Sequence, residues 1–246
     1  KLSGADIPIH KQLIDAIPQL GRSLVESLHP QGAIDFTFRS EWKELTQPRA
    51  EVSLDIGLKD CSIKYDRFPL PLRGINGLLT ARDWRWDVKE VVAVGTHDST
   101  IVKCGGSVVP RGTGWHADLD FNAENLPLDE TLKSALSPGV KQAWGELGPQ
   151  GRIDVAVHVA HDTHEPKPAI ELVLRPHGRS VSLQLARFPY RLEEVEGEAR
   201  YRPGRVEFTN VLARHDREVF SVASGTWNAT PDGGWVSTHA DITERE

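Results

Sequence analysis

The chain has 246 residues, of which 39% are hydrophobic and 26% are charged, so its composition excludes a disordered or membrane-embedded protein. Its net charge of −6 argues against a nucleic-acid-binding surface, which requires a basic stripe. The longest apolar runs, such as 91–94, are far shorter than the roughly 20 residues of a membrane-spanning helix. Two cysteines, Cys61 and Cys104, provide neither a repeated disulfide framework nor a metal site of paired cysteines.

One segment of the sequence occurs twice. Residues 28–38 read LHPQGAIDFTF, residues 147–157 read LGPQGRIDVAV, and their glycines, Gly32 and Gly151, are 151 − 32 = 119 positions apart. Each copy ends a helical pattern with Pro-Gln-Gly and opens a strand with alternating apolar residues. Because this pattern of a helix end followed by a strand occurs twice, it predicts a tandem array of two similar structural units.

The first copy begins with a helical region. Proline at position 18 interrupts it, which predicts two short helices with a kink, and Pro30 and Gly32 end the helical part. The apolar residues that recur on one helical face are Leu13, Ile14, Ile17, Leu20, Leu24, Val25 and Leu28.

Strands follow the helices of the first copy. Apolar and polar residues alternate over 34–38 and 52–58, which is typical of antiparallel strands that bury one face only. Residues 68–71, Phe-Pro-Leu-Pro, are expected to break the ladder after a strand at 62–66. Further strands at 74–81, 84–94, 100–109 and 115–121 complete a predicted meander.

The second copy repeats this order. Ser137 and Pro138 read as the N-cap and first residue of its second helix. Alternating strands follow at 153–157, 170–174 and 181–185, Phe188 repeats Phe68, and Gly234-Trp235 repeats Gly114-Trp115. The predicted fold is therefore mainly β: two tandem repeats of a curled antiparallel meander sheet, each with a short kinked helix pair. The repeats span 1–121 and 122–246 and pack as one continuous array.

Two short helices cannot cover a sheet of six strands, which is about 29 Å wide at ~4.8 Å per strand. The rest of the apolar face either closes into a barrel or sandwich filled by side chains, or stays open as a trough for acyl chains. The pattern leaves both alternatives open. The residues predicted to face a lipid are Ile34, Phe36, Phe38, Val52, Leu54, Ile56, Ile153, Val155, Val157, Ile170, Leu172 and Leu174.

These motifs resemble AsmA-like bacterial envelope proteins, and most closely the tandem AsmA-like regions of large planctomycete-type proteins. The motifs are the Pro-Gln-Gly-x-Ile-Asp strand start at 149–154, the Phe-Pro segment that runs to Gly197, and the segment 204–225, with their first-copy counterparts. The resemblance covers nearly the whole chain and concerns repeat architecture rather than catalysis.

The resemblance implies a repeating β-groove that carries phospholipid through the periplasm. It further implies an envelope protein, anchored in the inner membrane through a segment outside this chain. Its expected partners are a phospholipid or other acyl lipid and neighbouring repeats of the same parent chain.

Histidines are the main candidates for other chemistry. His158, His161 and His164 could share a metal only if their segment were helical, and the strand-and-loop pattern there favours a solvated loop. His97-Asp98 and His215-Asp216 could each act as a base with an orienting carboxylate, but aspartate also suits a tight turn.

The sequence therefore predicts a non-enzymatic lipid-binding or lipid-transfer segment with an apolar concave sheet and no catalytic residue, metal or cofactor. The alternatives are a structural spacer or assembly module with a filled core, and an enzyme that uses the histidine–aspartate pairs.

Overall fold

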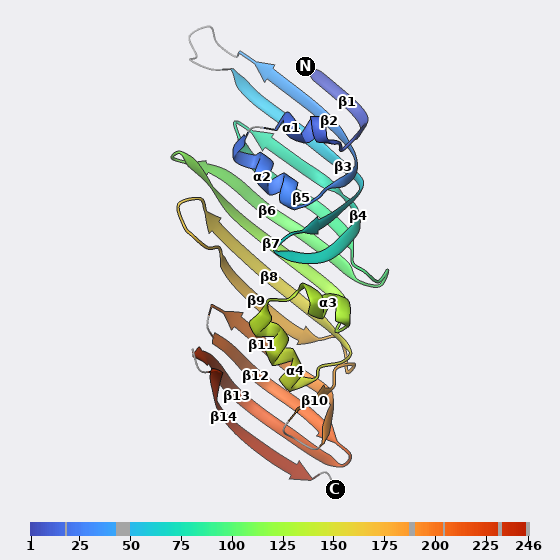
Figure 1. The fold of residues 1–246 in the computed structure, drawn as a ribbon, viewed down its shortest axis with the longest axis vertical. Helices are drawn as coiled ribbons and strands as arrows, with labels where there is room; N and C mark the ends of the chain where they lie inside the picture. Colours follow the sequence, from blue (N-terminus) through green and yellow to red (C-terminus); the bar gives the residue numbers. More distant parts are fainter. Residues whose placement is uncertain (18, 43–49, 187–189, 204, 231–232, 245–246) are drawn as a thin grey trace. The chain divides into compact units, whose positions relative to one another are not determined.

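The computed structural model describes residues 1–17, 19–42, 50–186, 190–203, 205–230 and 233–244 (Figure 1). In this part of the chain, 13 antiparallel strands follow one another in sequence order in one meander sheet that does not close, and a further short strand, β10, pairs with β11. The predicted β meander is confirmed. A closed barrel is not formed.

The structure divides into two compact units, Lys1–Phe121 with Val159–Pro168, and Asn122–His158 with Ala169–Glu246. The first unit contains the elements from β1 to β6, and β7 (Gly114–Pro127) and β8 (Arg152–Asp162) contribute residues to both units. The elements of the first unit are β1 (Leu2–Pro8), α1 (Lys11–Asp15), α2 (Gln19–Ser27), β2 (Gln31–Glu41), β3 (Glu51–Tyr65), β4 (Phe68–Arg82), β5 (Arg85–Val94) and β6 (Ile101–Arg111).

The second unit also has a helix pair before most of its strands. Its remaining elements are α3 (Glu130–Ala135), α4 (Pro138–Leu147), β9 (Ala169–Pro176), β10 (Leu183–Gln184), β11 (Arg191–Arg202), β12 (Arg205–His215), β13 (Glu218–Thr230) and β14 (Gly233–Glu244). Figure 1 shows each helix pair lying against the strands of its own unit. Among the described residues, no helix has the length and apolar run needed to cross a membrane.

The helix pairs begin and end as local sequence dictates. Asp129 caps α3 by accepting a hydrogen bond from the Leu132 N–H at 2.9 Å. Ser137 and Pro138 occupy the N-cap and the start of α4 as predicted, although the Ser137 side chain makes no capping bond. Gly148 then ends α4 in the left-handed region. The predicted break between α1 and α2 exists, while Pro18 itself lies outside the described residues.

Two strands are longer than predicted. β3 runs without a break from Glu51 to Tyr65, and β4 already begins at Phe68, so the Phe-Pro-Leu-Pro segment starts a strand instead of ending one. The prolines are tolerated because β5 pairs with β4 only as far as Arg73, so β5 requires no backbone N–H from residues 68–72. The second-copy Phe188 and Pro189, Gly204 and Asp232 lie outside the described residues.

Each unit has a small hydrophobic core near the end of the strands where its helix pair is attached, which we call the helix end. In the first unit Cys61, Ile75 and Ala93 are buried together; in the second, Val181, Val195 and Ala213. Backbone hydrogen bonds tie the helices to this end. Ile9 donates to the Gly32 carbonyl at 2.9 Å, and Leu128 donates to the Gly151 carbonyl, also at 2.9 Å.

Substitution of Gly151 should test how tightly this end is packed. Gly151 has a φ of +108°, and an added Cβ would lie 2.1 Å from the Ser180 carbonyl oxygen. Gly151→Ala should therefore lower the free energy of unfolding by about 2–3 kcal/mol, measured by urea denaturation.

Gly145 in α4 provides the control, because an added Cβ there meets nothing within 4 Å. Gly145→Ala should stabilise the chain by about 0.5–1 kcal/mol. Equal effects of the two substitutions would contradict the packing described at Gly151.

Candidate functional site

In the first unit, the register of the strands brings apolar side chains together on one face of the sheet. Phe36 lies opposite Ile56 of β3, Ile56 lies opposite Leu79 of β4, and Leu79 lies opposite Val88 of β5. Directly paired residues share a face, so these four side chains form a row across four strands. A second row lies next to it, and together the rows form what we call the apolar face: Phe36, Phe38, Leu54, Ile56, Leu79, Ala81, Trp86 and Val88.

The opposite face of the same strands is polar. Thr37 pairs with Asp55, Asp55 with Thr80, and Thr80 with Asp87. The Arg82 guanidinium lies 2.7 Å from the Asp55 carboxylate on this face. The predicted alternation of an apolar and a polar face is therefore present in the paired register.

The apolar face is not sealed in a core. Of its members only Ala81 is fully buried, while its phenylalanine, leucine, isoleucine, valine and tryptophan side chains remain half-buried. The largest side chain with almost no exposure among the described residues is that of Thr100. A single sheet layer with short helices leaves apolar surface accessible.

The residues of the first unit that were predicted to face a lipid all lie on one side of the sheet, but they differ in burial. Phe36, Phe38, Leu54 and Ile56 lie on the apolar face, and Val52 lies opposite Ser40 on the same side. Ile34 is buried.

In the second unit, Ile153 packs against the core, while Leu172 lies opposite Tyr201 and Leu174 opposite Ala199 on a shared face. Strand alternation puts Val155 and Val157 on the same side of β8 as Ile153, and Ile170 on the same side of β9 as Leu172. All four of Val155, Val157, Leu172 and Leu174 are half-buried.

An aspartate at the start of a strand holds a left-handed residue in each unit. Asp35 accepts a hydrogen bond from the backbone N–H of Asp6, and Asp154 accepts one from Asn125, each at 2.8 Å. Asp6 has a φ of 52° and Asn125 a φ of 60°, a conformation that aspartate and asparagine tolerate better than other side chains. We call these two contacts the aspartate latches. The repeated Ile-Asp was visible in the sequence, but its role was missed.

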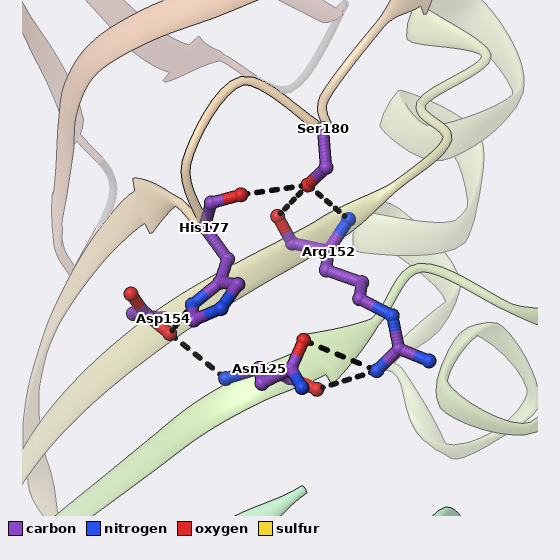
Figure 2. Close-up of polar contacts among 5 residues, drawn as sticks. All are labelled: Asn125, Arg152, Asp154, His177 and Ser180. Atoms are coloured by element: carbon purple, nitrogen blue, oxygen red, sulfur yellow. Dashed lines mark hydrogen bonds and ion pairs between the residues drawn. The ribbon is translucent and has the colours of Figure 1, made fainter. Parts of the chain in front are cut away.

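The side chains around the latches differ between the units. Lys59 lies 2.8 Å from Asp6 and 2.9 Å from Asp35. The Asp6 backbone hydrogen bond, followed by Lys59, lowers the pKa of Asp35 below its usual 3.8. In the second unit, Arg152 donates to the carbonyl of Asn125 at 3.1 Å, and His177 lies 2.9 Å from Asp154 (Figure 2).

Asp154 of the second latch lies near a histidine, His177, and a serine, Ser180, but these three residues are not arranged as a catalytic triad. In Figure 2 the Ser180 hydroxyl points to backbone groups: it donates to the His177 carbonyl at 2.8 Å and accepts from the Arg152 N–H at 3.2 Å. A nucleophilic serine would instead need to contact the imidazole ring. The geometry serves to hold the 177–180 turn against β8.

The three clustered histidines do not share a metal site. His158 and His161 lie within β8, where residues three apart point to opposite faces, and His164 lies beyond the strand end. His161 contacts the Trp115 ring edge-on, with the ring centroids 5.3 Å apart. The segment is therefore more extended than the predicted loop.

The two histidine–aspartate pairs lie at strand ends. His97 and Asp98 are exposed in the turn between β5 and β6, where Arg73 lies 2.6 Å from Asp98. His215 is the last residue of β12, and its ring contacts the Arg191 carbonyl at 3.1 Å and stacks at a tilt on Tyr190.

The predicted strand at 84–94 would place Trp84 and Trp86, two residues apart, on one face. Trp86 lies on the apolar face, but Trp84 lies in the turn between β4 and β5 with a φ of 68°, and 60% of its surface is exposed. The expectation was wrong because the strand begins only at Arg85.

No family model, no curated protein and no solved structure matches this chain. The candidate site therefore depends on the geometry of the chain itself, and the accessible apolar face is its most extensive feature.

The Asp35 latch should make stability depend on pH. Because the pKa of Asp35 is lowered in the folded chain, its charge contributes stability that is complete above about pH 4 and declines as the pH falls through the lower folded value. Asp35→Asn keeps an oxygen acceptor for Asp6 but removes the charge. The stability difference between the wild type and this variant, from urea titrations at pH 2–6, should shrink on acidification. A constant difference would contradict the latch.

The cysteine thiols should be unreactive in the folded chain. Both are free, Cys61 is buried, and burial followed by the nearby Asp120 carboxylate raises the pKa of Cys104 to about 11. Because the thiolate is the nucleophile, iodoacetamide at pH 8 should label neither residue until urea unfolds the chain. Mass spectrometry of the labelled peptides measures this directly, and rapid labelling of native Cys104 would contradict the burial.

Proposed function

We propose that this chain is a non-enzymatic lipid-binding segment whose apolar face holds the acyl chains of a phospholipid. The supporting observation is the half-buried apolar face of the first unit, which crosses four paired strands and has a polar face behind it. Isolated exposed apolar residues are normal on proteins, whereas a connected apolar face is typical of an interaction surface.

The geometry suits a ligand that is apolar along its length. Each methylene group removed from water contributes about 0.8 kcal/mol, so an acyl chain gains affinity in small equal steps along the rows of side chains. No charged side chain belongs to the two rows of the apolar face. A ligand held in this way can slide without breaking any single strong contact.

We also propose that the two units are tandem repeats. The three buried residues of each core correspond at one spacing, 181 − 61 = 120 for Cys61 and Val181, and the same for Ile75 with Val195 and for Ala93 with Ala213. The aspartate latches correspond at the spacing 154 − 35 = 119. Equivalent positions therefore perform equivalent structural roles.

The cellular setting is a further proposal, supported by the resemblance to AsmA-like proteins alone. It comprises a periplasmic, envelope-associated location, an inner-membrane anchor outside this chain, and neighbouring repeats of the parent protein as partners.

Lipids that co-purify with the chain provide the first test. Lipid extraction and mass spectrometry should find phospholipid at a reproducible ratio to protein, and the delipidated chain should bind a fluorescent phospholipid. Absence of both would overturn the proposal in favour of a structural spacer.

Variants of the apolar face locate the binding. Ile56→Gln and Leu79→Gln each place an amide in the middle of the face, and each should weaken binding of the fluorescent phospholipid about tenfold, because burying such a side chain contributes roughly 1.5–3 kcal/mol. The control is Thr37→Gln, which carries the same side chain on the opposite face of β2. Far-ultraviolet circular dichroism verifies folding, and equal weakening by all three variants would exclude this face as the site.

A further inference from the structure

Tryptophans gather at the end of the first unit's strands that lies opposite the helix end. β2 ends and β3 begins there, and the turns from β4 to β5 and from β6 to β7 lie at the same end, which we call the far end. Trp42 directly follows β2, Trp84 lies in the β4–β5 turn, Trp86 is the second residue of β5, and Trp115 is the second residue of β7. Four of the seven tryptophans of the chain therefore lie here, and we call these four the tryptophan rim.

Trp84 occupies a position that tryptophan should not favour. Arg82 pairs with Arg85, so Asp83 and Trp84 form a two-residue turn, and both have positive φ, 50° and 68°. Turns of this type prefer Asn-Gly or Asp-Gly, because a bulky side chain in the left-handed region is strained. With 60% of its surface exposed, Trp84 is not retained for packing within the fold.

The turn itself is held in place without the tryptophan. The Asp83 carboxylate accepts a hydrogen bond from the Val52 N–H at 3.1 Å, and the Asp83 N–H donates to the Val52 carbonyl at 3.0 Å. The strained Trp84 therefore lies in a turn whose position is fixed by hydrogen bonds to β3.

Trp42 is strongly exposed as well, whereas Trp86 and Trp115 are half-buried. Trp42 is 61% exposed, and Leu2, which begins β1 at the same end, is 62% exposed. Trp86 connects the rim to the apolar face, where it lies opposite Ala81. Tryptophan combines a large apolar ring with a polar N–H, which is why it concentrates where one side of a surface is apolar and the other is wet.

Charge decides the kind of surface that fits the rim. Three described arginines near the rim lie close to carboxylates: Arg82 is 2.7 Å from Asp55, Arg111 is 3.1 Å from Asp162 and Arg85 is 3.8 Å from Asp87. The chain as a whole carries a net charge of −6. A negatively charged chain is repelled by anionic lipid, so the attraction is assigned to the aromatic rings, which suits a zwitterionic bilayer.

We propose that the tryptophan rim is a membrane-docking surface that inserts into the interfacial region of a zwitterionic phospholipid bilayer. Docking there brings the bilayer to the end of the apolar face, so a lipid reaches that face without crossing water. The route onto the face depends on the lipid-binding function proposed above, but docking itself does not.

The decisive variant is Trp84→Gly. It converts the turn to Asp-Gly, so the melting temperature should stay the same or rise, while co-flotation of the full chain with phosphatidylcholine vesicles should fall about tenfold, the effect of losing one buried aromatic side chain. Trp42→Ala should also weaken flotation. The control is Phe68→Ala, which removes an exposed aromatic ring from the helix end of β4, the strand that precedes the Trp84 turn, and should leave flotation unchanged.

Several results would overturn the proposal. One is flotation of Trp84→Gly equal to that of the wild type, and another is binding that occurs only with phosphatidylglycerol vesicles. A change in oligomeric state instead of flotation, measured by sedimentation velocity, would assign the rim to self-association. The two proposals fail separately, because Trp84→Gly should keep its affinity for the fluorescent phospholipid, and Ile56→Gln should still float with vesicles.

Discussion

The pairing register of alternating strands is the constraint on which the rest of the structure depends. When Phe36 pairs with Ile56, the neighbouring Thr37 necessarily pairs with Asp55, so each uninterrupted stretch of register assigns its side chains to alternate faces. A slip by a single residue would exchange the two faces. The apolar face of the first unit lies where the pairing of β2 to β5 is uninterrupted, whereas bulges shift the register elsewhere along the same strands.

The aspartate latches show how that register is fixed where the strands leave the helices. The backbone bond to the left-handed residue is the same in both units, but the side chain beside the aspartate changes from Lys59 to His177. Exposed ion pairs contribute little, whereas a hydrogen bond that positions backbone strongly restricts the chain. The bond from carboxylate to backbone is therefore the essential part, and the side chain beside the carboxylate can differ.

The sequence was sufficient to predict what depends on local period and turn chemistry. The helix pairs, the start of α4 at Pro138, the meander and the alternation on β2 and β3 are all confirmed. Continuity of β4 through its prolines depends on where β5 ends, and the position of Trp84 depends on a two-residue turn, so neither follows from period alone. The sequence pattern also left open whether the apolar face is covered by other parts of the chain, because that depends on where the helices and strands pack in three dimensions.

The meander order also determines how such a sheet can assemble. In the first unit each strand from β2 to β6 pairs with the strand directly before it, so the chain segments that must be closed are short and the entropy lost at each step is small. Each of these strands pairs with a strand synthesised directly before it, so the sheet can extend hairpin by hairpin as the chain emerges from the ribosome. The cost is that each newly added strand exposes an unpaired edge until the next one arrives.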